Sequence, residues 1–235
     1  MDKIFCIAEA VEDHLRKAVF WNPDKVVTIR KGHHPNWYEA IPAIDLKKEF
    51  ALPENAFVAC CVANTRPMKG IPYLVEAMNL IPSDLPIYLL LVGKGLDTPE
   101  VKEIVAKGPA KERVIFTGFR SDALSIDKSA DCFVLASLYG EAITKAVIEA
   151  MSLGTAPLIT DIPGNKNLVL NEKCGLVVPK ANAQALANGL MRYYNEPEFR
   201  EEMAKAAKAY MQSEFHTDKT AEGYYREYNK LLESK

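Results

Sequence analysis

Two cations and a glycine lie close together in the segment Arg66–Gly70, which reads RPMKG. This segment follows the apolar run Phe57–Val62 and precedes a stretch with helical spacing. A helix start offers free backbone N–H groups to an anion, while arginine adds a planar fork and lysine a point charge. Arg66 and Lys69 could therefore hold a diphosphate from two sides. Two solvated loop cations are the simpler interpretation of this motif taken alone.

A pair of glutamates, Glu141 and Glu149, follows the apolar run Cys132–Leu135, with seven residues between the two acids. Gly140 permits a tight turn and Thr144 suits the N-cap of a helix, so Glu141 would lie in the loop and Glu149 in the second helical turn. Both could then border one cleft. Carboxylates accept hydrogen bonds from the paired hydroxyls of a ribose or hexose, and the helix amides suit phosphate. An exposed helix residue and a loop carboxylate are the alternative interpretation.

Three further features are weaker indications of a ligand site. Thr117–Arg120 (TGFR) could flank a nucleobase with backbone and an aromatic ring, or it could be an ordinary turn. Gly93–Gly95 (GKG) resembles part of a dinucleotide fingerprint, but no third glycine follows, so NAD and FAD are not expected. His33 and His34 would point to opposite sides of an extended segment, which disfavours a metal site. No D-x-D pair is present to clamp a divalent ion on a diphosphate.

The elements that must position these residues alternate between short apolar runs and stretches of helical period. The runs are nearly continuous in Val, Ile and Leu, which predicts a doubly wound, Rossmann-like parallel sheet covered on both faces, with ligands beyond the carboxyl ends of its strands. The predicted strands are Val26–Ile29, Phe57–Val62, Ile87–Val92, Val114–Thr117, Cys132–Leu135, Ala156–Thr160 and Gly175–Val178. The predicted helices are Ile71–Leu80, Thr98–Lys107, Ser121–Lys128, Lys145–Leu153 and Ala183–Tyr194.

The two ends of the chain differ from this array. The first 20 residues predict a short strand, Ile4–Ala8, and a helix, Glu9–Val19. Residues 197–235 are rich in Ala, Glu, Lys and Tyr and have no strand pattern. They predict one or two amphipathic helices, interrupted near Ser213–Thr217, that pack on the outside of the sheet.

Charge and composition exclude several classes of protein. Among 235 residues, 29 Lys and Arg oppose 31 Asp and Glu with the signs interspersed, which does not fit a nucleic-acid-binding protein. The apolar runs are far shorter than the ~20 residues of a membrane-spanning helix. We therefore expect a cytoplasmic protein. The cysteines form an odd set without a C-x-x-C pair, so neither disulfides nor structural zinc is expected; they are Cys6, Cys60, Cys61, Cys132 and Cys174.

Five motifs in order, each after its own strand, resemble the donor half of the retaining glycosyltransferases of family four, the glycosyl transferases group 1. The motifs are Arg66–Gly70, Leu91–Gly95, Phe116–Phe119, Ala130–Ser137 and Glu141–Gly154. The resemblance spans residues 26–194. It implies a single lobe of the two-lobed GT-B architecture, followed by C-terminal helices.

The resemblance also implies roles for individual residues. Arg66 and Lys69 would contact the diphosphate and Glu141 the donor sugar, and these three would be the catalytic groups. Glu149 would accept hydrogen bonds from the ribose. The remaining implied contacts are the backbone of Ala142, Ile143, Thr144 and Lys145 with sugar and phosphate, and Phe119 and Arg120 with the base.

The sequence departs from the family pattern in several places. The family usually has glycine where this chain has Ala142 and Thr144. Where the family often has G-G-x-x-E, this chain has Pro163–Asn167 (PGNKN) without the acid. Lys31–His34 (KGHH) replaces the more usual Asn-Gly-x-Asp at the junction of the lobes.

The chain is expected to be one lobe of a longer enzyme. Residues 1–25 would be the remnant of an acceptor lobe and linker, 26–196 the nucleotide-sugar-binding domain and 197–235 helices packed on it. The implied reaction is transfer of a glycosyl group to a hydroxyl with retention of configuration, in glycan or polysaccharide biosynthesis, without metal or cofactor. The acceptor, a glycan or a lipid-linked molecule, would bind the missing lobe, and the full enzyme could lie peripherally on the inner membrane. The alternatives are a non-catalytic nucleotide-sugar-binding module, a lobe like that of a nucleotide-sugar epimerase, and an α/β interaction domain.

Overall fold

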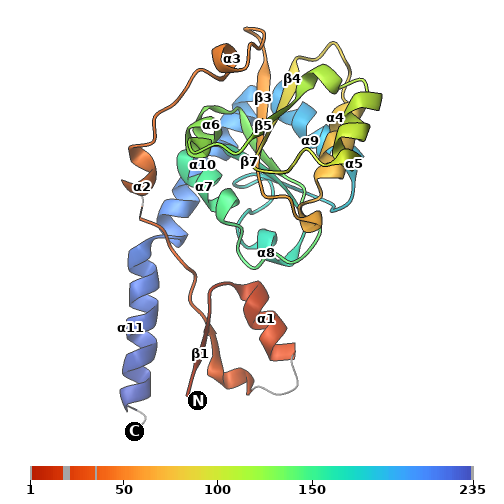
Figure 1. Cartoon of the computed structure of the whole chain (residues 1–235). Helices are drawn as coiled ribbons and strands as arrows, with labels where there is room; N and C mark the ends of the chain where they lie inside the picture. Colours follow the sequence, from red (N-terminus) through yellow and green to blue (C-terminus); the bar gives the residue numbers. More distant parts are fainter. Residues whose placement is uncertain (1, 18–21, 35, 234–235) are drawn as a thin grey trace.

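The computed structural model describes residues 2–17, 22–34 and 36–233. Its centre is a six-stranded sheet in the order β5-β4-β3-β6-β7-β8, in which every neighbouring pair is parallel (Figure 1). The doubly wound α/β sheet predicted from the sequence is confirmed. The strands are β3 (Phe57–Val62), β4 (Ile87–Val92), β5 (Val114–Gly118), β6 (Cys132–Leu135), β7 (Ala156–Thr160) and β8 (Leu176–Val178).

Apolar side chains cover both faces of this sheet. Alternate residues of β3 serve opposite faces, with Ala59 and Cys61 in one buried cluster and Val58 and Cys60 in the other. The five cysteines are free and buried. Burial raises the pKa of the Cys61 thiol to about 12, so the thiol packs as a small apolar group.

The helices are distributed by the direction in which the chain winds. From β3 through α4 and α5 to β5 the chain moves one way, and from β6 through α7 to β8 it moves the other way. Right-handed crossovers therefore place α4 and α5 on one face and α7 on the opposite face (Figure 1). These helices, with those that follow the sheet, are α4 (Ile71–Leu80), α5 (Pro99–Lys107), α6 (Ala123–Ser129), α7 (Lys145–Leu153), α8 (Pro163–Lys166), α9 (Ala183–Asn195) and α10 (Pro197–Glu214).

The winding reverses between β3 and β6, which are hydrogen-bonded neighbours. At such a switch point the loops leaving the two strands turn away on opposite faces and leave a crevice beyond the carboxyl ends. The loop after β3 carries Arg66–Gly70, and the loop after β6 carries Glu141. The topology thus brings the two leading sequence motifs to the same edge of the sheet.

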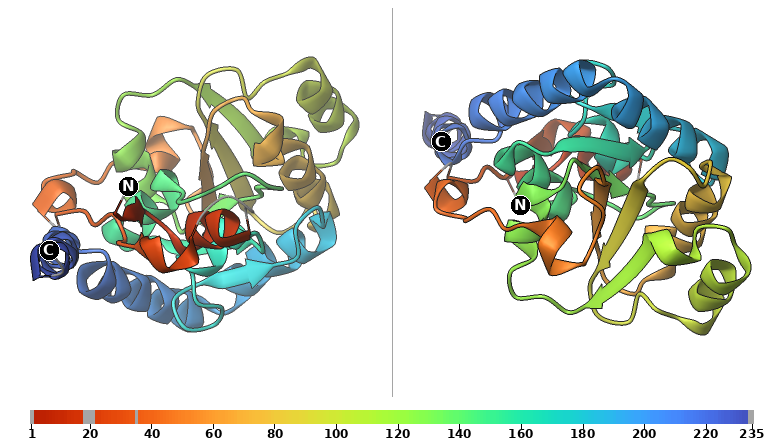
Figure 2. Two further views of the ribbon diagram at one scale, coloured as in Figure 1. Left: turned by 90° about the horizontal axis from the view of Figure 1, so that it is seen from below. Right: turned by 90° about the horizontal axis from the view of Figure 1, so that it is seen from above.

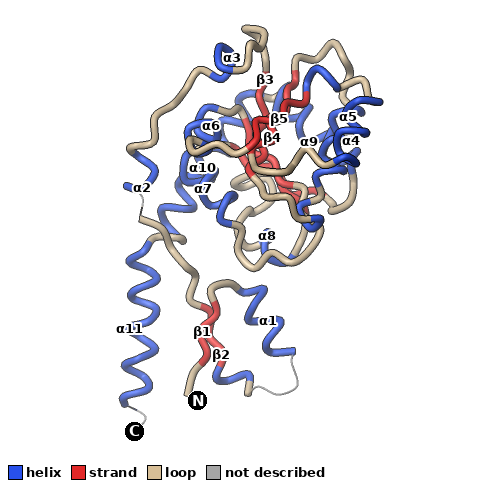
Figure 3. The backbone as a smooth tube through the Cα atoms, in the orientation of Figure 1, coloured by secondary structure: helices blue, strands red, loops and turns tan. Residues whose placement is uncertain are grey.

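The first strands of the chain form a separate parallel pair (Figure 3). β1 (Ile4–Cys6) and β2 (Val26–Thr28) are joined through α1 (Glu9–Lys17). The prediction that the strand at Val26–Ile29 joins the main array is wrong. This strand, β2, pairs instead with β1, and α1 connects the two so that Ile4 lies opposite Val26. Residues 18 and 19 of the helix predicted over Glu9–Val19 lie outside the described residues.

The interrupted C-terminal helix is confirmed, because α10 ends at Glu214 and α11 (Thr217–Glu233) begins after a short turn. α10 buries Met203, Ala207 and Met211 and contacts both α7 and β7. Figure 2 shows α10 running from α9 past α7 to α11. α11 leaves the main sheet and contacts the small one, where the Phe5 and Tyr224 rings meet edge to face at 5.2 Å. Among the described residues, the helices include none with the length and apolarity needed to cross a membrane.

Two chain crossings connect the small sheet to the main one, and hydrogen bonds tie them together. His33 donates its backbone N–H to the carbonyl of Phe215 at 2.6 Å. The Thr220 hydroxyl donates to the Arg30 carbonyl at 2.7 Å and accepts from the Gly32 N–H at 2.8 Å. We refer to residues 30–33 and 215–220 as the joint.

Asp127 is an ionisable side chain buried beneath α7. It lies in α6 with 1% of its surface exposed, and its Oδ1 atom has no hydrogen-bond partner among the described residues. Burial raises the pKa of this carboxyl well above its ordinary value, and the negative charge of Glu149 adds to the effect. Burial therefore favours the neutral form of the Asp127 carboxyl in the folded chain.

The substitution Asp127→Asn is expected to stabilise the chain more as the pH rises. The unfolded carboxyl loses its proton above about pH 4, whereas the folded carboxyl keeps its proton to a higher pH. Between the pKa of the unfolded state and that of the folded state, the free energy of unfolding therefore falls by up to about 1.4 kcal/mol per pH unit. Asparagine does not titrate, and the other groups are common to both chains. Melting temperatures at pH 4.5, 6 and 7.5 measure the difference. A difference that stays constant across the three would show that Asp127 is ionised in the folded state.

Candidate functional site

The loops after β3 and β6 are in direct contact at the switch point. The Leu138 N–H donates to the Met68 carbonyl at 2.7 Å. Gly70 adopts a left-handed conformation, φ 63°, and a Cβ atom there would lie 2.1 Å from the Ala136 carbonyl oxygen. Glycine is required at this position both by its conformation and by the close approach of the other loop.

Lys69 and Glu141 meet across this contact. The Lys69 Nζ lies 2.5 Å from Glu141 Oε1, and the two side chains are only 12% and 10% exposed. Ser137 donates its hydroxyl to the same oxygen at 3.1 Å. The lysine of the first motif and the first glutamate of the second are therefore in direct contact. Charges this far removed from water interact strongly with an ionic or hydroxyl-bearing ligand.

The start of α7 is open beside this pair. Thr144 occupies the predicted N-cap position, but its hydroxyl does not cap the helix. It donates instead to the buried Oδ1 of Asn165, at 3.0 Å. Val147 donates its N–H to the Thr144 carbonyl at 3.0 Å. The N–H groups of Lys145 and Ala146 have no hydrogen-bond partner among the described residues, so their partial positive charge is available to an anion.

Asn165 is a site residue that the sequence argument missed. It lies in the PGNKN segment and is fully buried, and its amide nitrogen donates to the Thr160 carbonyl at 3.1 Å. In the same segment, a Cβ atom on Gly164 would lie 2.1 Å from the Glu141 carbonyl oxygen. Residues 163–167 therefore pack directly against the loop that carries Glu141. The only signal for this in the sequence is the departure from the family pattern.

Glu149 lies in the second turn of α7, as predicted, and is paired. Its Oε1 is 2.8 Å from the Nζ of Lys145, which is 74% exposed, whereas Glu149 itself is 15% exposed. The charge of Glu149 also acts on His33 and Tyr38. These two side chains form a pair that the sequence did not predict, with His33 Nδ1 2.8 Å from the Tyr38 hydroxyl. Burial lowers the pKa of His33, partly opposed by the charge of Glu149, and burial raises the pKa of Tyr38 to about 12.

Arg66 lies apart from the Lys69–Glu141 pair. It is exposed and lines a hollow of about 470 Å³ between the starts of α4 and α5, together with Gly70 and Leu138. The described part of the chain offers its guanidinium no hydrogen-bond or ion-pair partner. The structure therefore places Arg66 in the same loop as Lys69 but outside the ion pair.

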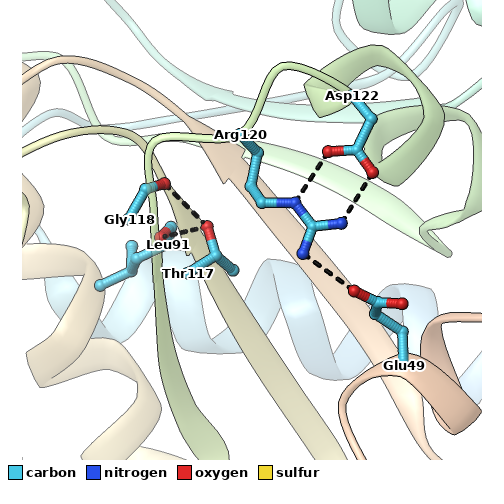
Figure 4. A network of polar contacts seen from close by, with 6 residues as sticks. All are labelled: Glu49, Leu91, Thr117, Gly118, Arg120 and Asp122. Atoms are coloured by element: carbon cyan, nitrogen blue, oxygen red, sulfur yellow. Dashed lines mark hydrogen bonds and ion pairs between the residues drawn. The ribbon is translucent and has the colours of Figure 1, made fainter.

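Phe119 and Arg120 directly follow β5, at the far side of the same sheet edge. Phe119 is 76% exposed. The Arg120 guanidinium is bonded to Asp122 and Glu49, so its charge is already matched by two carboxylates (Figure 4). A second hollow, of about 280 Å³, lies against Gly118 and shares Leu96 with the first. The two hollows thus adjoin along the edge formed by β3, β4 and β5.

The described residues contain no cluster of three or more His, Cys, Asp or Glu side chains arranged to hold a metal ion. His33 and His34 face different partners: the ring of His33 lies 5.6 Å from Trp37 and that of His34 lies 5.6 Å from His216. What the edge does provide is a paired lysine and glutamate, an open helix start and adjoining hollows. That combination suits a phosphorylated ligand with hydroxyl groups.

Fold and site together define a Rossmann-like lobe of the GT-B glycosyltransferase type. A glycosyltransferase from Rickettsia africae ESF-5 superimposes with a TM-score of 0.89 at 21% identity, covering 100% of this chain and 64% of that one. Anabaena HepE, solved in complex with UDP-glucose, has a TM-score of 0.83 at 20% identity and covers 96% and 64%.

The chain belongs to the glycosyl transferases group 1, whose family model matches residues 43–210. The UDP-Gal:α-D-GlcNAc-diphosphoundecaprenol α-1,3-galactosyltransferase of Escherichia coli is 30% identical to it over 199 residues, which are 81% of this chain and 50% of the relative. The chain spans half to about three-fifths of the length of this and the next curated relatives. The resemblance inferred from the five motifs is confirmed at the level of the family.

Proposed function

We propose that this chain is the donor-binding lobe of a retaining glycosyltransferase and holds a nucleoside diphosphate sugar at the switch point of its sheet. One observation carries the proposal: Lys69, from the loop after β3, meets Glu141, from the loop after β6, beside the open start of α7. Membership of the family and the UDP-glucose complex of a structural neighbour support it.

In this proposal, the chain acts mainly by electrostatics. When the bond between the sugar and the diphosphate breaks, negative charge grows on the leaving diphosphate. Lys69, Arg66 and the amides at the start of α7 stabilise that charge more in the transition state than in the ground state. Removing one such donor typically costs on the order of 3 kcal/mol of barrier. No metal is needed to balance the charge.

The two glutamates orient the donor. Glu141 accepts hydrogen bonds from the sugar hydroxyls, with the backbone of residues 142–145 close by, and Glu149 accepts them from the ribose. Because Lys145 occupies one Glu149 oxygen in the free chain, the ribose either shares that carboxylate or displaces the lysine. We assign Glu141 no covalent bond to the sugar; the acceptor hydroxyl attacks the face that the diphosphate leaves.

The acceptor is proposed to bind the part of the enzyme that the longer relatives have in addition. The name of the Escherichia coli relative describes an acceptor linked to a lipid diphosphate. For this chain, we propose a hydroxyl of a glycan or a lipid-linked sugar, with transfer of a hexosyl group, in glycan biosynthesis. Such an acceptor would place the enzyme on the cytoplasmic side of a membrane.

Binding of nucleotides tests the donor site directly. We expect UDP, GDP or ADP, and the matching sugar nucleotide, to raise the melting temperature of this chain and to give a saturable heat in calorimetry. Ligand at about 100 times its Kd stabilises the folded state by about 2.7 kcal/mol. An α/β interaction module would show no shift with any of the three. Transfer is then assayed on this chain and on a longer form that includes the preceding lobe.

A further inference from the structure

The loop that leaves β5 is fastened by one fully engaged arginine. Arg120 donates from Nε and Nη2 to the two carboxylate oxygens of Asp122, both at 2.7 Å, and from Nη1 to Glu49 Oε1 at 2.9 Å (Figure 4). This is the bidentate arrangement that the planar fork favours, with a second carboxylate at the remaining nitrogen. The pKa of Asp122 is lowered, chiefly by its hydrogen bonds from Arg120.

Glu49, which bonds Arg120 from a distant part of the sequence, is itself held in place by its own helix. It ends the short helix α3 (Leu46–Glu49), in which Asp45 accepts the Lys48 N–H at 3.0 Å as N-cap. Leu46 is buried in the cluster that covers β3 and β4. The Arg120 guanidinium also lies over the Phe50 ring, 5.8 Å from its centre. α3 is therefore anchored to the sheet, and the loop is anchored to α3.

The backbone held in this way is shaped to expose a flat surface. The pairing of β4 with β5 shifts register, so that Val92 lies opposite Gly118; such bulges re-aim the end of a strand. Gly118 has φ +69° and an added Cβ would meet nothing within 4 Å. Gly118 lines the 280 Å³ hollow, and the residue that follows it, Phe119, has its ring exposed to solvent. A planar group could lie here against backbone and ring.

We propose that Glu49 and Asp122 act through Arg120 as positioning residues for nucleobase recognition, holding Gly118 and Phe119 as the surface on which the base stacks. This inference rests on the proposed function and deepens it. It also changes the role expected for Arg120, because a guanidinium bonded to two carboxylates has little charge left to offer a ligand. The contact with the base is left to the Phe119 ring and the backbone.

The test compares a nucleoside diphosphate with inorganic pyrophosphate, which lacks a base. The variant is Glu49→Gln, and the ligand is whichever of UDP, GDP and ADP binds the unaltered chain most tightly in calorimetry. We expect its Kd to rise about fivefold, which corresponds to the contribution of a partly exposed ion pair. We also expect the differences in Kd among UDP, GDP and ADP to become smaller. The Kd of pyrophosphate, which is proposed to contact Lys69, Arg66 and the start of α7, should not change.

The chain contains a matched control. Arg192 also bonds two carboxylates, Glu172 at 2.7 Å and Glu196 at 3.3 Å, and lies over the ring of Phe199, but on the opposite end of the sheet from the site. Glu172→Gln should leave both ligands unaffected. The variant Arg120→Lys loses the fork and should raise the Kd of the nucleotide about tenfold, again without changing that of pyrophosphate.

Three results would overturn the inference. If Glu49→Gln leaves nucleotide binding unchanged or strengthens it while Arg120→Lys weakens it, Arg120 contacts the ligand itself. If the variants weaken nucleotide and pyrophosphate equally, they act on the whole site and not on the base. If the unaltered chain binds neither ligand, the proposed function fails, and the inference with it.

Discussion

Replacing Lys69 by alanine is expected to raise the Kd of a nucleoside diphosphate by at least about tenfold, since a hydrogen bond to a charged group is worth about 1.5–3 kcal/mol. Two effects add in this variant. The ligand loses a cation, and the Glu141 carboxylate, which is nearly buried, keeps only the Ser137 hydroxyl as a partner among the described residues. An unbalanced negative charge then faces the phosphates. Titration calorimetry measures the affinity.

The control is Lys107→Ala, because Lys107 is likewise paired with a glutamate, Glu103, but on the exposed surface of α5. Pairs of this kind contribute little, so the affinity of the control variant should equal that of the unaltered chain. Equal affinities in all three proteins would remove Lys69 from the phosphate site. Since the proposal depends on the meeting of Lys69 and Glu141, that result would also leave the proposed donor site without its main support.

The variant Gly70→Ala is expected to destabilise the chain by about 3 kcal/mol or more, by adding a steric clash to backbone strain. The strain arises because the residue is left-handed, and the clash arises because its Cβ would lie 2.1 Å from the Ala136 carbonyl oxygen. The loops after β3 and β6 would have to separate, which would also pull Lys69 away from Glu141. Urea unfolding gives the free energy, and calorimetry gives the loss of nucleotide affinity.

Gly154→Ala separates the two causes. Gly154 is also left-handed, φ 84°, but the nearest atom to an added Cβ is the flexible Lys208 Cδ at 3.6 Å. This variant should show backbone strain alone, about 1–2 kcal/mol. If both variants lose the same free energy, the contact between the two loops is loose enough to yield. The role assigned to Gly70 would then reduce to its conformation.

Most of the sheet could be predicted because its strands are uninterrupted apolar runs of the length that a doubly covered sheet requires. The runs 57–62 and 87–92 appear as strands with the predicted bounds. Val26–Ile29 has the same composition but belongs to the small sheet. Composition indicates that a strand is buried, but it does not indicate which strand lies next to it. The pairing of this strand with β1 was therefore not predictable from composition.

The site was predictable where two residues face one crevice because of topology. The sequence placed Lys69 and Glu141 in loops that leave the carboxyl ends of two strands, and the structure shows that these strands are neighbours at the switch point. The partners of Arg120 and Thr144 were not predictable in the same way. Glu49 is 71 positions from Arg120 and belongs to no motif, and Asn165 is 21 positions from Thr144, in a segment that departs from the family pattern. Such contacts depend on how α3 and α8 pack on the sheet.

The joint has a mechanical consequence. One polypeptide crossing between two bodies lets them swivel in any direction, because rotation about a few backbone bonds meets little resistance. Residues 30–33 and 215–220 form two crossings side by side, cross-linked by the Thr220 hydroxyl and by the hydrogen bond from His33 to Phe215. Torsion about the line joining the bodies would break those links, whereas bending across the pair would strain them least. The connection therefore resists torsion more than a single crossing would.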